Sequence, residues 1–274
     1  MTDVATAPAP APADRAASTR RRTLAAVAWP LLGLAVAIGL WWAGTALFAI
    51  NTVVLPSPPA VIDGFNRYRE FLVDEAWNTT AATVEGFLLS VAAGVLLGVA
   101  IAAWSPFERM FSPLLVAFNA VPKVALAPLV LIWFGYGRTP ILAMAFMVCF
   151  FPIVLSTATG LTSTPADLVE LARSMDASRV QTFARIRLPA ALPQIFVGLK
   201  VAMPLAVIGV VVGEMQYGES GLGTIIVQTS GQGDTATAFA AITLLALVSI
   251  VLYYLLVVIE RLALPWVRAT TSQR

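Results

Sequence analysis

Few side chains in this 274-residue sequence could do chemistry. The sequence contains no histidine, which removes the commonest general base and the commonest metal ligand. The single cysteine, Cys149, has no partner for a disulfide bond. The two lysines, Lys123 and Lys200, do not stand in the GxxxxGK[ST] frame that cradles phosphates. We therefore expect no catalytic residue, no metal site and no cofactor in this chain, and any nucleotide chemistry must come from another polypeptide.

The densest group of charged side chains is the segment 165–188, which reads PADLVELARSMDASRVQTFARIRL and is followed by Pro189. Seven of its 24 residues are charged, whereas charged residues make up 12% of the whole sequence. Strongly apolar stretches flank it on both sides. A charged segment of this length between two apolar stretches is a candidate surface for docking another protein.

The first half of this segment carries the signals of a short helix. Thr164 precedes Pro165 and stands three residues before Asp167, which predicts an N-cap, a proline at the first helical position and a capping-box partner. Apolar residues then recur at helical spacing, at Leu168, Leu171 and Met175. The pattern predicts a first helix over about 165–175.

A second helix is expected after Asp176, Ala177 and Ser178, and Ser178 is able to cap it. Its apolar positions recur at every third residue, at Val180, Phe183 and Ile186. We expect Pro189 to end this helix, with Pro193 preceding the next apolar stretch. One interpretation is a solvated loop whose arginines serve only membrane topology. That interpretation leaves the regular apolar positions unexplained, because an apolar helical stripe in water needs a groove to fill.

The elements that must position this loop are long apolar stretches. Hydrophobic residues make up 59% of the sequence and its mean hydropathy is +0.84, which does not suit a water-soluble globule. Six stretches approach the roughly 20 residues that cross the hydrocarbon core of a membrane. They lie near 24–49, 80–104, 112–134, 139–161, 194–214 and 236–259, and prolines interrupt the third. The expected fold class is all-α, a polytopic membrane protein with six transmembrane helices.

The arginines predict an orientation for these helices. With the N-terminus in the cytoplasm, twelve of the fifteen arginines lie on the cytoplasmic side, which is a strong positive-inside bias. The segment 165–188 and both termini are then cytoplasmic. We expect residues 1–19, rich in Ala and Pro, to be a disordered tail, residues 20–268 to be the transmembrane domain, and 269–274 to be a second tail.

Two external segments are long enough to hold structure of their own. The segment 50–79 contains LPSPPAV, whose prolines force an extended entry, and its remainder is expected to include a short surface helix. The segment 214–235 is rich in Gly, Ser and Thr, and its LGTIIVQ stretch is expected to form a short re-entrant or interfacial piece.

The stretch ELARSMDASRVQTFARIRLPAALPQIFVGLK resembles the cytoplasmic loop of ABC importer permeases. That pattern reads E-A-A, three residues, Gly, nine residues, Ile, one residue, Leu-Pro, and it falls here on Glu170, Leu171, Ala172, Asp176, Ile186, Leu188 and Pro189. Other stretches resemble the nitrate, sulfonate and taurine branch of these binding-protein-dependent importers, including those at 55–61, 121–137 and 213–226. One departure is Leu171 in place of the middle alanine. The other is Asp176 in place of a glycine with left-handed backbone, a conformation that Asp visits more readily than most residues.

The resemblance implies a mechanism and a set of partners. The fold would be that of a type I ABC importer permease, with the loop 165–189 as a coupling helix-turn-helix between the fourth and fifth spans. The residues that couple to the ATPase would be Glu170, Leu171, Ala172, Asp176, Ala177, Ser178, Ile186, Leu188 and Pro189. The partners would be cytoplasmic ATP-binding subunits that bind ATP and Mg²⁺, a second permease copy and an extracytoplasmic solute-binding protein, all at a bacterial inner membrane and without nucleic acid. Closure of the ATPase would switch the permease between two accessible states.

Charged residues in or beside the apolar stretches are candidates for the translocation path or its gate. Lys123 either snorkels to the membrane surface or lines the path for an anion. Glu214, at the outer end of the fifth stretch, is a candidate for the external gate or for contact with the binding protein. Lys200 is expected to snorkel, and Glu85 to pair with a polar neighbour that the sequence does not identify.

Two other classes of protein remain as alternatives. A membrane-embedded enzyme would need paired aspartates, a serine with a base or a metal set, and no apolar stretch carries two carboxylates. A channel or scaffold subunit without ATP coupling leaves the loop pattern unexplained. Within the importer interpretation the substrate stays open, because the family takes up nitrate, sulfonates, taurine and bicarbonate, and relatives carry pyrimidines or riboflavin-like vitamins.

Overall fold

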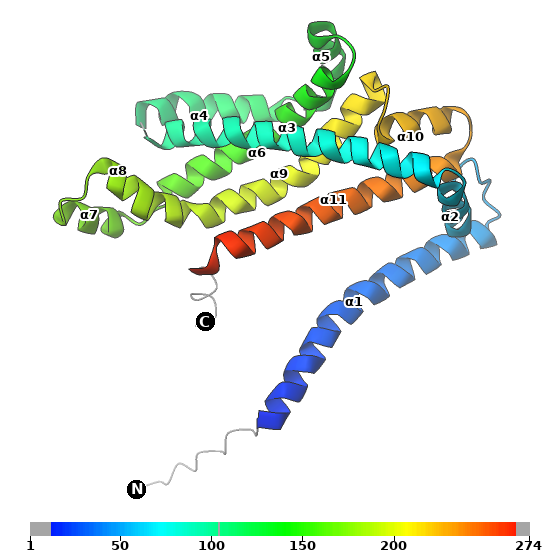
Figure 1. The fold of residues 1–274 in the computed structure, drawn as a ribbon, viewed down its shortest axis with the longest axis horizontal. Helices are drawn as coiled ribbons and strands as arrows, with labels where there is room; N and C mark the ends of the chain where they lie inside the picture. The colour runs from blue at the N-terminus through cyan, green and yellow to red at the C-terminus, as the bar shows by residue number, and fades with distance from the viewer. Residues whose placement is uncertain (1–11, 104, 267–274) are drawn as a thin grey trace.

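Long helices make up most of the structure, a computed structural model that describes residues 12–103 and 105–266 (Figure 1). The helices are α1 (Pro12–Leu47), α2 (Pro58–Arg67), α3 (Arg69–Ala103), α4 (Ser105–Ala120), η1 (Lys123–Leu126), α5 (Ala127–Phe134), α6 (Arg138–Thr162), α7 (Ala166–Ser174), α8 (Arg179–Thr182), η2 (Phe183–Arg187), α9 (Leu188–Tyr217), α10 (Leu222–Gly231) and α11 (Thr235–Ala263). The described elements therefore confirm the all-α fold class. Of the predicted tails, residues 1–11 and 269–274 lie outside the described residues, whereas residues 12–19 are helical and form the start of α1.

The centre of the bundle is formed by α3, α6 and α9, and α6 has the most extensive contacts with the other two. Glycines allow these helices to approach closely. A Cβ added to Gly94 of α3 would lie 2.8 Å from Ile153 of α6, and a Cβ added to Gly209 of α9 would lie 2.7 Å from the Cα of Ala145 on α6. Small residues are the usual means of packing membrane helices, so α6 packs closely against both α3 and α9.

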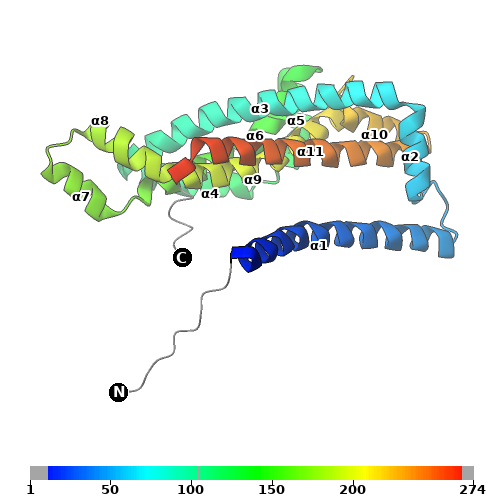
Figure 2. The same ribbon diagram turned by 60° about the horizontal axis from the view of Figure 1, so that its bottom comes forward.

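The remaining helices surround this centre. Helix α11 packs along α9, α10 and α2, and α10 lies against α9 and α3. Helix α1 stands apart from the bundle in both ribbon views (Figure 2). Its contact with the rest is near its C-terminal end, where Trp41 donates a hydrogen bond from Nε1 to the carbonyl of Pro56 at 3.1 Å and lies 6.1 Å from the ring of Phe239.

Five helices have the length and composition of membrane spans in the described residues, namely 28–47, α3, α6, 179–217 and α11. The expected span at 112–134 is not one helix. Helix α4 and the pair η1–α5 meet at a bend of 80° and form a sixth span only if counted together. The physical reason is Pro122, which has extended backbone (φ −70°, ψ 96°) and no N–H to continue the helical ladder.

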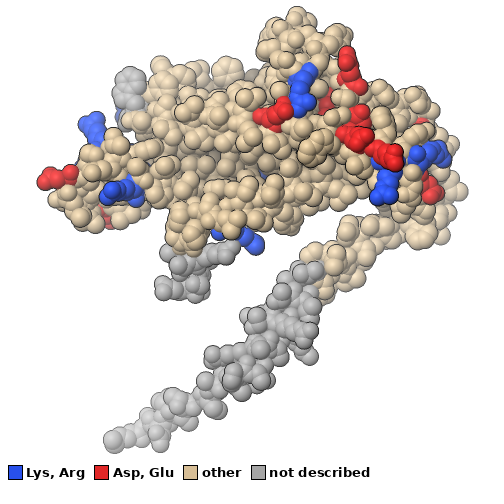
Figure 3. Space-filling view, in the orientation of Figure 1, with Lys and Arg blue, Asp and Glu red and all other residues tan. Residues whose placement is uncertain are grey.

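Charged side chains gather towards the two ends of the molecule (Figure 3). One end carries α7 and α8, and we call it the loop end; the other carries α2 and α10, and we call it the α10 end. A broad zone between them shows few charges on this face. This distribution is the one expected for helices that cross a membrane.

Candidate functional site

The turn after α7 has the conformation that the sequence predicted for Asp176. Its φ is +57°, so a non-glycine residue occupies the left-handed region here. The backbone N–H of Asp176 donates to the carbonyl of Arg173, and that of Ala177 donates to the carbonyl of Ala172, both at 3.0 Å. These two bonds form a Schellman motif, which satisfies the last carbonyls of α7 and reverses the chain.

The start of α7 differs from the prediction. The N-cap is Pro165, with no hydrogen bond from a side chain, and Thr164 instead donates its hydroxyl to the carbonyl of Leu161 at 3.4 Å. The predicted capping box of Thr164 and Asp167 is therefore wrong. The hydroxyl of Thr164 is drawn to the end of α6, whose last carbonyls also need donors.

Ser178 caps α8 as predicted. Its hydroxyl accepts a hydrogen bond from the N–H of Gln181 at 3.2 Å, and the side-chain oxygen of Gln181 accepts one from the N–H of Ser178 at 2.8 Å. The predicted helix end at Pro189 is wrong, because the helical chain continues from Arg179 to Tyr217 and contains Pro193. A π-helical turn, η2, ends at Arg187, two residues before Pro189, and the N–H of Leu188 donates to the carbonyl of Phe183, which shifts the hydrogen-bond register just before the proline.

The exposed apolar residues of the loop form a surface that we call the tip surface. It consists of Leu168, Leu171, Met175 and Val180, which are 45%, 58%, 75% and 76% exposed. On the other side of α7, Val169 and Ala172 are buried, so α7 is amphipathic with an apolar exposed stripe. The predicted stripe of Val180, Phe183 and Ile186 is not an exposed surface, since Phe183 packs against the core and Ile186 is half-buried.

Some of the predicted coupling residues are exposed to solvent, and the others are buried or half-buried. Glu170, Leu171, Asp176 and Ser178 are exposed, whereas Ala172 is buried and Ala177, Ile186, Leu188 and Pro189 are half-buried. The loop projects beyond the ends of the long helices (Figure 1). It therefore offers an apolar surface edged by carboxylates to any partner that approaches this end.

A second polar cluster, which we call the α10 anchor, lies at the opposite end. Glu214 of α9 is 3% exposed, and its carboxylate accepts hydrogen bonds from the Thr79 hydroxyl of α3 and from the N–H of Gly223, both at 2.8 Å. The Thr79 oxygen in turn accepts from the N–H of Leu222 at 2.9 Å. The N–H of Gly221 donates to the carboxylate of Glu75.

The α10 anchor satisfies the first backbone donors of α10, which have no partner within their own helix. Its carboxylates also face the positive end of the helix dipole. Gly221 has φ +103°, a region that only glycine enters readily, and any side chain there would collide with the carboxylate of Glu214. The LGTIIVQ stretch forms the first seven residues of α10, and its re-entrant or interfacial position stays a prediction. The sequence placed Glu214 at this end but gave no sign of Thr79 as its partner.

Lys123 lies at the bend between α4 and α5. Its ammonium donates to the side-chain oxygen of Asn119 at 2.8 Å and lies 5.3 Å from the ring centre of Phe151. Asn119 and Phe151 line a cavity of about 400 Å³ between α3, α4, α6 and α9, whose hydroxyl groups come from Ser156, Thr159 and Thr162. Lys123 and Glu214 belong to separate clusters, so the structure does not bring the two predicted path residues together.

Two ion pairs among the described residues join positions far apart in the sequence. Lys200 of α9 pairs with Glu260 of α11 at 2.8 Å, so the predicted snorkelling lysine is instead bound within the protein. Glu85 of α3 has the partner that the sequence did not identify, since Arg138 of α6 donates to both of its oxygens at 2.7 and 2.9 Å. The described residues contain no group of three or more potential metal ligands.

Comparison with known proteins adds to this geometry. Residues 91–268 match the family described as "Binding-protein-dependent transport system inner membrane component". The riboflavin transport system permease protein RibX of Chloroflexus aurantiacus is 36% identical over 257 residues, which cover 91% of this chain and 95% of RibX. The formylaminopyrimidine transport permease protein ThiX of Halalkalibacterium halodurans is 35% identical, over 82% of this chain and 90% of ThiX.

Less similar relatives are named for other substrates. The taurine transport system permease protein TauC of Escherichia coli is 30% identical over 241 residues, covering 85% of this chain and 87% of TauC. Among solved structures, the inward-facing MetNI methionine ABC transporter matches with a TM-score of 0.60 and 21% identity, over 73% of this chain and 97% of the matched chain. That structural likeness supports the fold alone.

Proposed function

This chain belongs to the family of binding-protein-dependent transport system inner membrane components, and from that premise we propose a substrate, an orientation and a mode of coupling. It is an ABC importer permease subunit and a multi-pass membrane protein. Permease subunits of this family are not ATPases themselves. The proposal therefore concerns what passes through the chain and how a separate ATPase moves it.

We propose that the loop end faces the cytoplasm and that the tip surface docks in a groove of an ATP-binding subunit. The exposed stripe of α7 supports this, because an apolar helical face in water gains free energy by filling a groove. Glu170 and Asp176 lie beside this face and would fix its orientation by pairing with cations of the partner. ATP-driven closure of that subunit would then bias the permease towards one of two accessible states.

We propose that the transported solute is a small organic molecule with a nitrogen-containing ring, of the riboflavin or formylaminopyrimidine kind. The observation that carries this proposal is the identity to RibX and ThiX, 36% and 35%, over most of both chains. The solute-binding protein would select the ligand and deliver it to the α10 end. We further propose that two copies of the chain pack around the path.

A sulfonate of the taurine kind is the second candidate. Lys123 favours it, because its ammonium lies beside a cavity of about 400 Å³ with hydroxyl groups in its wall. A cavity of this size accommodates a small organic anion. Import of nitrate, also expected from the sequence, stays a prediction.

The proposed coupling is tested by affinity purification of the full chain from native membranes. Wild-type chain is expected to recover an ATP-binding subunit, and the double variant Glu170→Ala/Asp176→Arg to lose it. The matched control is Glu70→Ala/Asp74→Arg, which changes exposed residues of the same types on α3 at the α10 end. Recovery of no ATPase, together with unchanged uptake by the loop variant, would show that the chain is not coupled to ATP.

The substrate is tested by uptake of labelled riboflavin, formylaminopyrimidine and taurine into cells that express the complete transporter. We expect saturable, ATP-dependent uptake of one of the two ring compounds. Uptake of taurine alone would support the sulfonate instead, and Lys123→Met should then lower it without changing the recovery of ATPase.

A further inference from the structure

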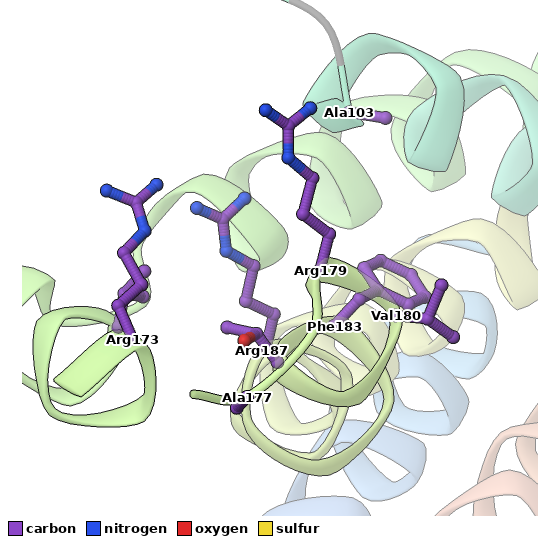
Figure 4. Close-up of a pocket in the computed structure, with 9 residues that line it drawn as sticks. Ala103, Arg173, Ala177, Arg179, Val180, Phe183 and Arg187 are labelled. Carbon is purple, nitrogen blue, oxygen red and sulfur yellow. The ribbon is translucent and has the colours of Figure 1, made fainter. Parts of the chain in front are cut away.

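A second cavity, of about 460 Å³, lies at the base of the loop and is lined by three arginines (Figure 4). They are Arg173, Arg179 and Arg187, from three different elements. The close-up shows their side chains extending in the same direction. This cavity is separate from the tip surface, apart from Val180, which belongs to both.

The loop geometry explains why arginines distant in sequence line one cavity. Arg173 is in the last turn of α7, and the left-handed turn at Asp176 then reverses the chain. Ser178 caps the new helix, so that Arg179 is its first residue. Arg187 follows two turns later, at the end of η2. The same capping motifs that form the loop therefore place three arginines from three elements around one cavity.

The cavity has no negative charge of its own. No aspartate or glutamate lines it, and no ion pair of these three arginines is present in the part of the chain that the structure describes. Like charges that face one cavity repel each other. An anion among them would remove that repulsion, and guanidinium groups match the oxygens of a phosphate with paired hydrogen bonds.

The other walls of the cavity are apolar. They include Val180, Phe183 and Ala103, and Ala103 is the last residue of the membrane-span candidate α3. The cavity therefore lies at the depth where a membrane helix ends, with cations beside apolar side chains. Basic pockets at the ends of membrane helices are known sites for the head groups of anionic lipids.

We propose that this cavity binds a phosphate group that carries a net negative charge, either in the head group of an anionic phospholipid or as a free anion. The phosphate oxygens accept hydrogen bonds from Arg173, Arg179 and Arg187. If the phosphate belongs to a lipid, its first apolar carbons pack on Val180 and Phe183. The site is independent of the transported solute.

The proposal is tested by native mass spectrometry of the full chain in detergent. The chain is titrated separately with dioctanoyl-phosphatidylglycerol, dioctanoyl-phosphatidylcholine and inorganic phosphate. We expect one tight site for phosphatidylglycerol, weakened about fivefold by each Arg→Gln change, from about 1 kcal/mol per arginine near a membrane surface. The matched control is Arg185→Gln, in the same π-helical turn but not lining the cavity. The triple Arg→Lys variant keeps the charge and should retain part of the binding.

Each outcome decides the proposal. Binding of phosphatidylglycerol without inorganic phosphate assigns the site to a lipid head group, and binding of both assigns it to the phosphate alone. Unchanged affinity in the triple Arg→Gln variant, equal loss in Arg185→Gln, or equal binding of phosphatidylcholine by the wild type would overturn it. If the triple variant binds every probe normally but recovers less ATPase, the arginines serve protein docking and the anion site is wrong.

Discussion

Replacing Glu214 by leucine tests whether the α10 anchor holds α10 in place. The wild-type carboxylate is buried and accepts hydrogen bonds from the Thr79 hydroxyl and from the N–H of Gly223. Leucine has a similar volume but no acceptor, so both donors lose their partner without a large cavity being formed. A buried donor left unpaired costs about 1–3 kcal/mol, so two such donors give a loss of about 2–6 kcal/mol.

Glutamine at the same position separates hydrogen bonding from charge. Its carbonyl oxygen can still accept from one of the two donors, so Glu214→Gln should lose about 1–3 kcal/mol, from one unpaired donor. Thr79→Val removes one of the donors together with the acceptor for Leu222. In the double variant Glu214→Leu/Thr79→Val the losses should be less than additive, because the two residues share one bond.

The assay is amide hydrogen exchange of the full chain in lipid nanodiscs, resolved at residues 221–223. Local opening of the first turn of α10 controls exchange at these amides. Every 1.4 kcal/mol of lost stability accelerates exchange about tenfold. We therefore expect acceleration of about 30-fold or more in Glu214→Leu, less in Glu214→Gln, and no change in α6.

Two results would refute this account. The first is equal protection of residues 221–223 in the wild type and in Glu214→Leu, which would mean that packing alone holds α10. The second is uniform acceleration across α3, α6 and α9, which would mean that the variant unfolds globally. Thr83→Val is the control on α3, since the Thr83 hydroxyl donates only within its own helix, to the carbonyl of Thr79.

Substitutions at three further sites, Asp176, Gly209 and Lys200, test other parts of the fold. Asp176→Gly should stabilise the loop turn by about 1 kcal/mol, because glycine adopts φ +57° without strain, whereas Asp176→Val should destabilise it by about 1–2 kcal/mol. Limited proteolysis at this turn measures both effects, and equal cleavage of the two variants would contradict the prediction. Gly209→Leu should lower the thermal midpoint, since even a Cβ would lie 2.7 Å from α6 backbone and overpacking costs about 1–3 kcal/mol, while Gly231→Leu, in open space, should not. Lys200→Met leaves Glu260 unpaired and should lower the free energy of unfolding by about 2 kcal/mol, as measured by thermal unfolding. Adding Glu260→Gln should restore most of that stability, and a larger loss in the double variant would contradict this prediction.

The turn and the cap inside the loop were predicted from nearby residues more successfully than the two ends where the loop joins α6 and α9. The N-cap at Ser178 and the left-handed turn at Asp176 depend on residues within a few positions of each other, so the sequence contains all that decides them. Thr164 failed as a cap because the end of α6 competed for its hydroxyl. Pro189 failed as a helix end because a π-helical turn accommodates it, and no spacing rule in the sequence indicates that turn.

The polar contacts between helices could not be predicted in the same way. Glu214 and Thr79 are 135 positions apart, and Lys200 and Glu260 are 60 apart. Hydropathy located these residues near the ends of spans, but their pairing depends on which helices are neighbours and how they are rotated. That rotation is set largely by close contacts such as those of Gly94 and Gly209 with α6.

The helical chain from Arg179 to Tyr217 connects the loop end to the α10 end without a break. At 1.5 Å per residue its 39 residues span about 58 Å, from the capped start of α8 to the α10 anchor. A tilt of about 0.1 radian about one end therefore displaces the other by about 6 Å, roughly one helical turn. If the close contacts of α9 with α6 keep this helix from bending, a small rotation at the loop end moves the α10 end by about that distance.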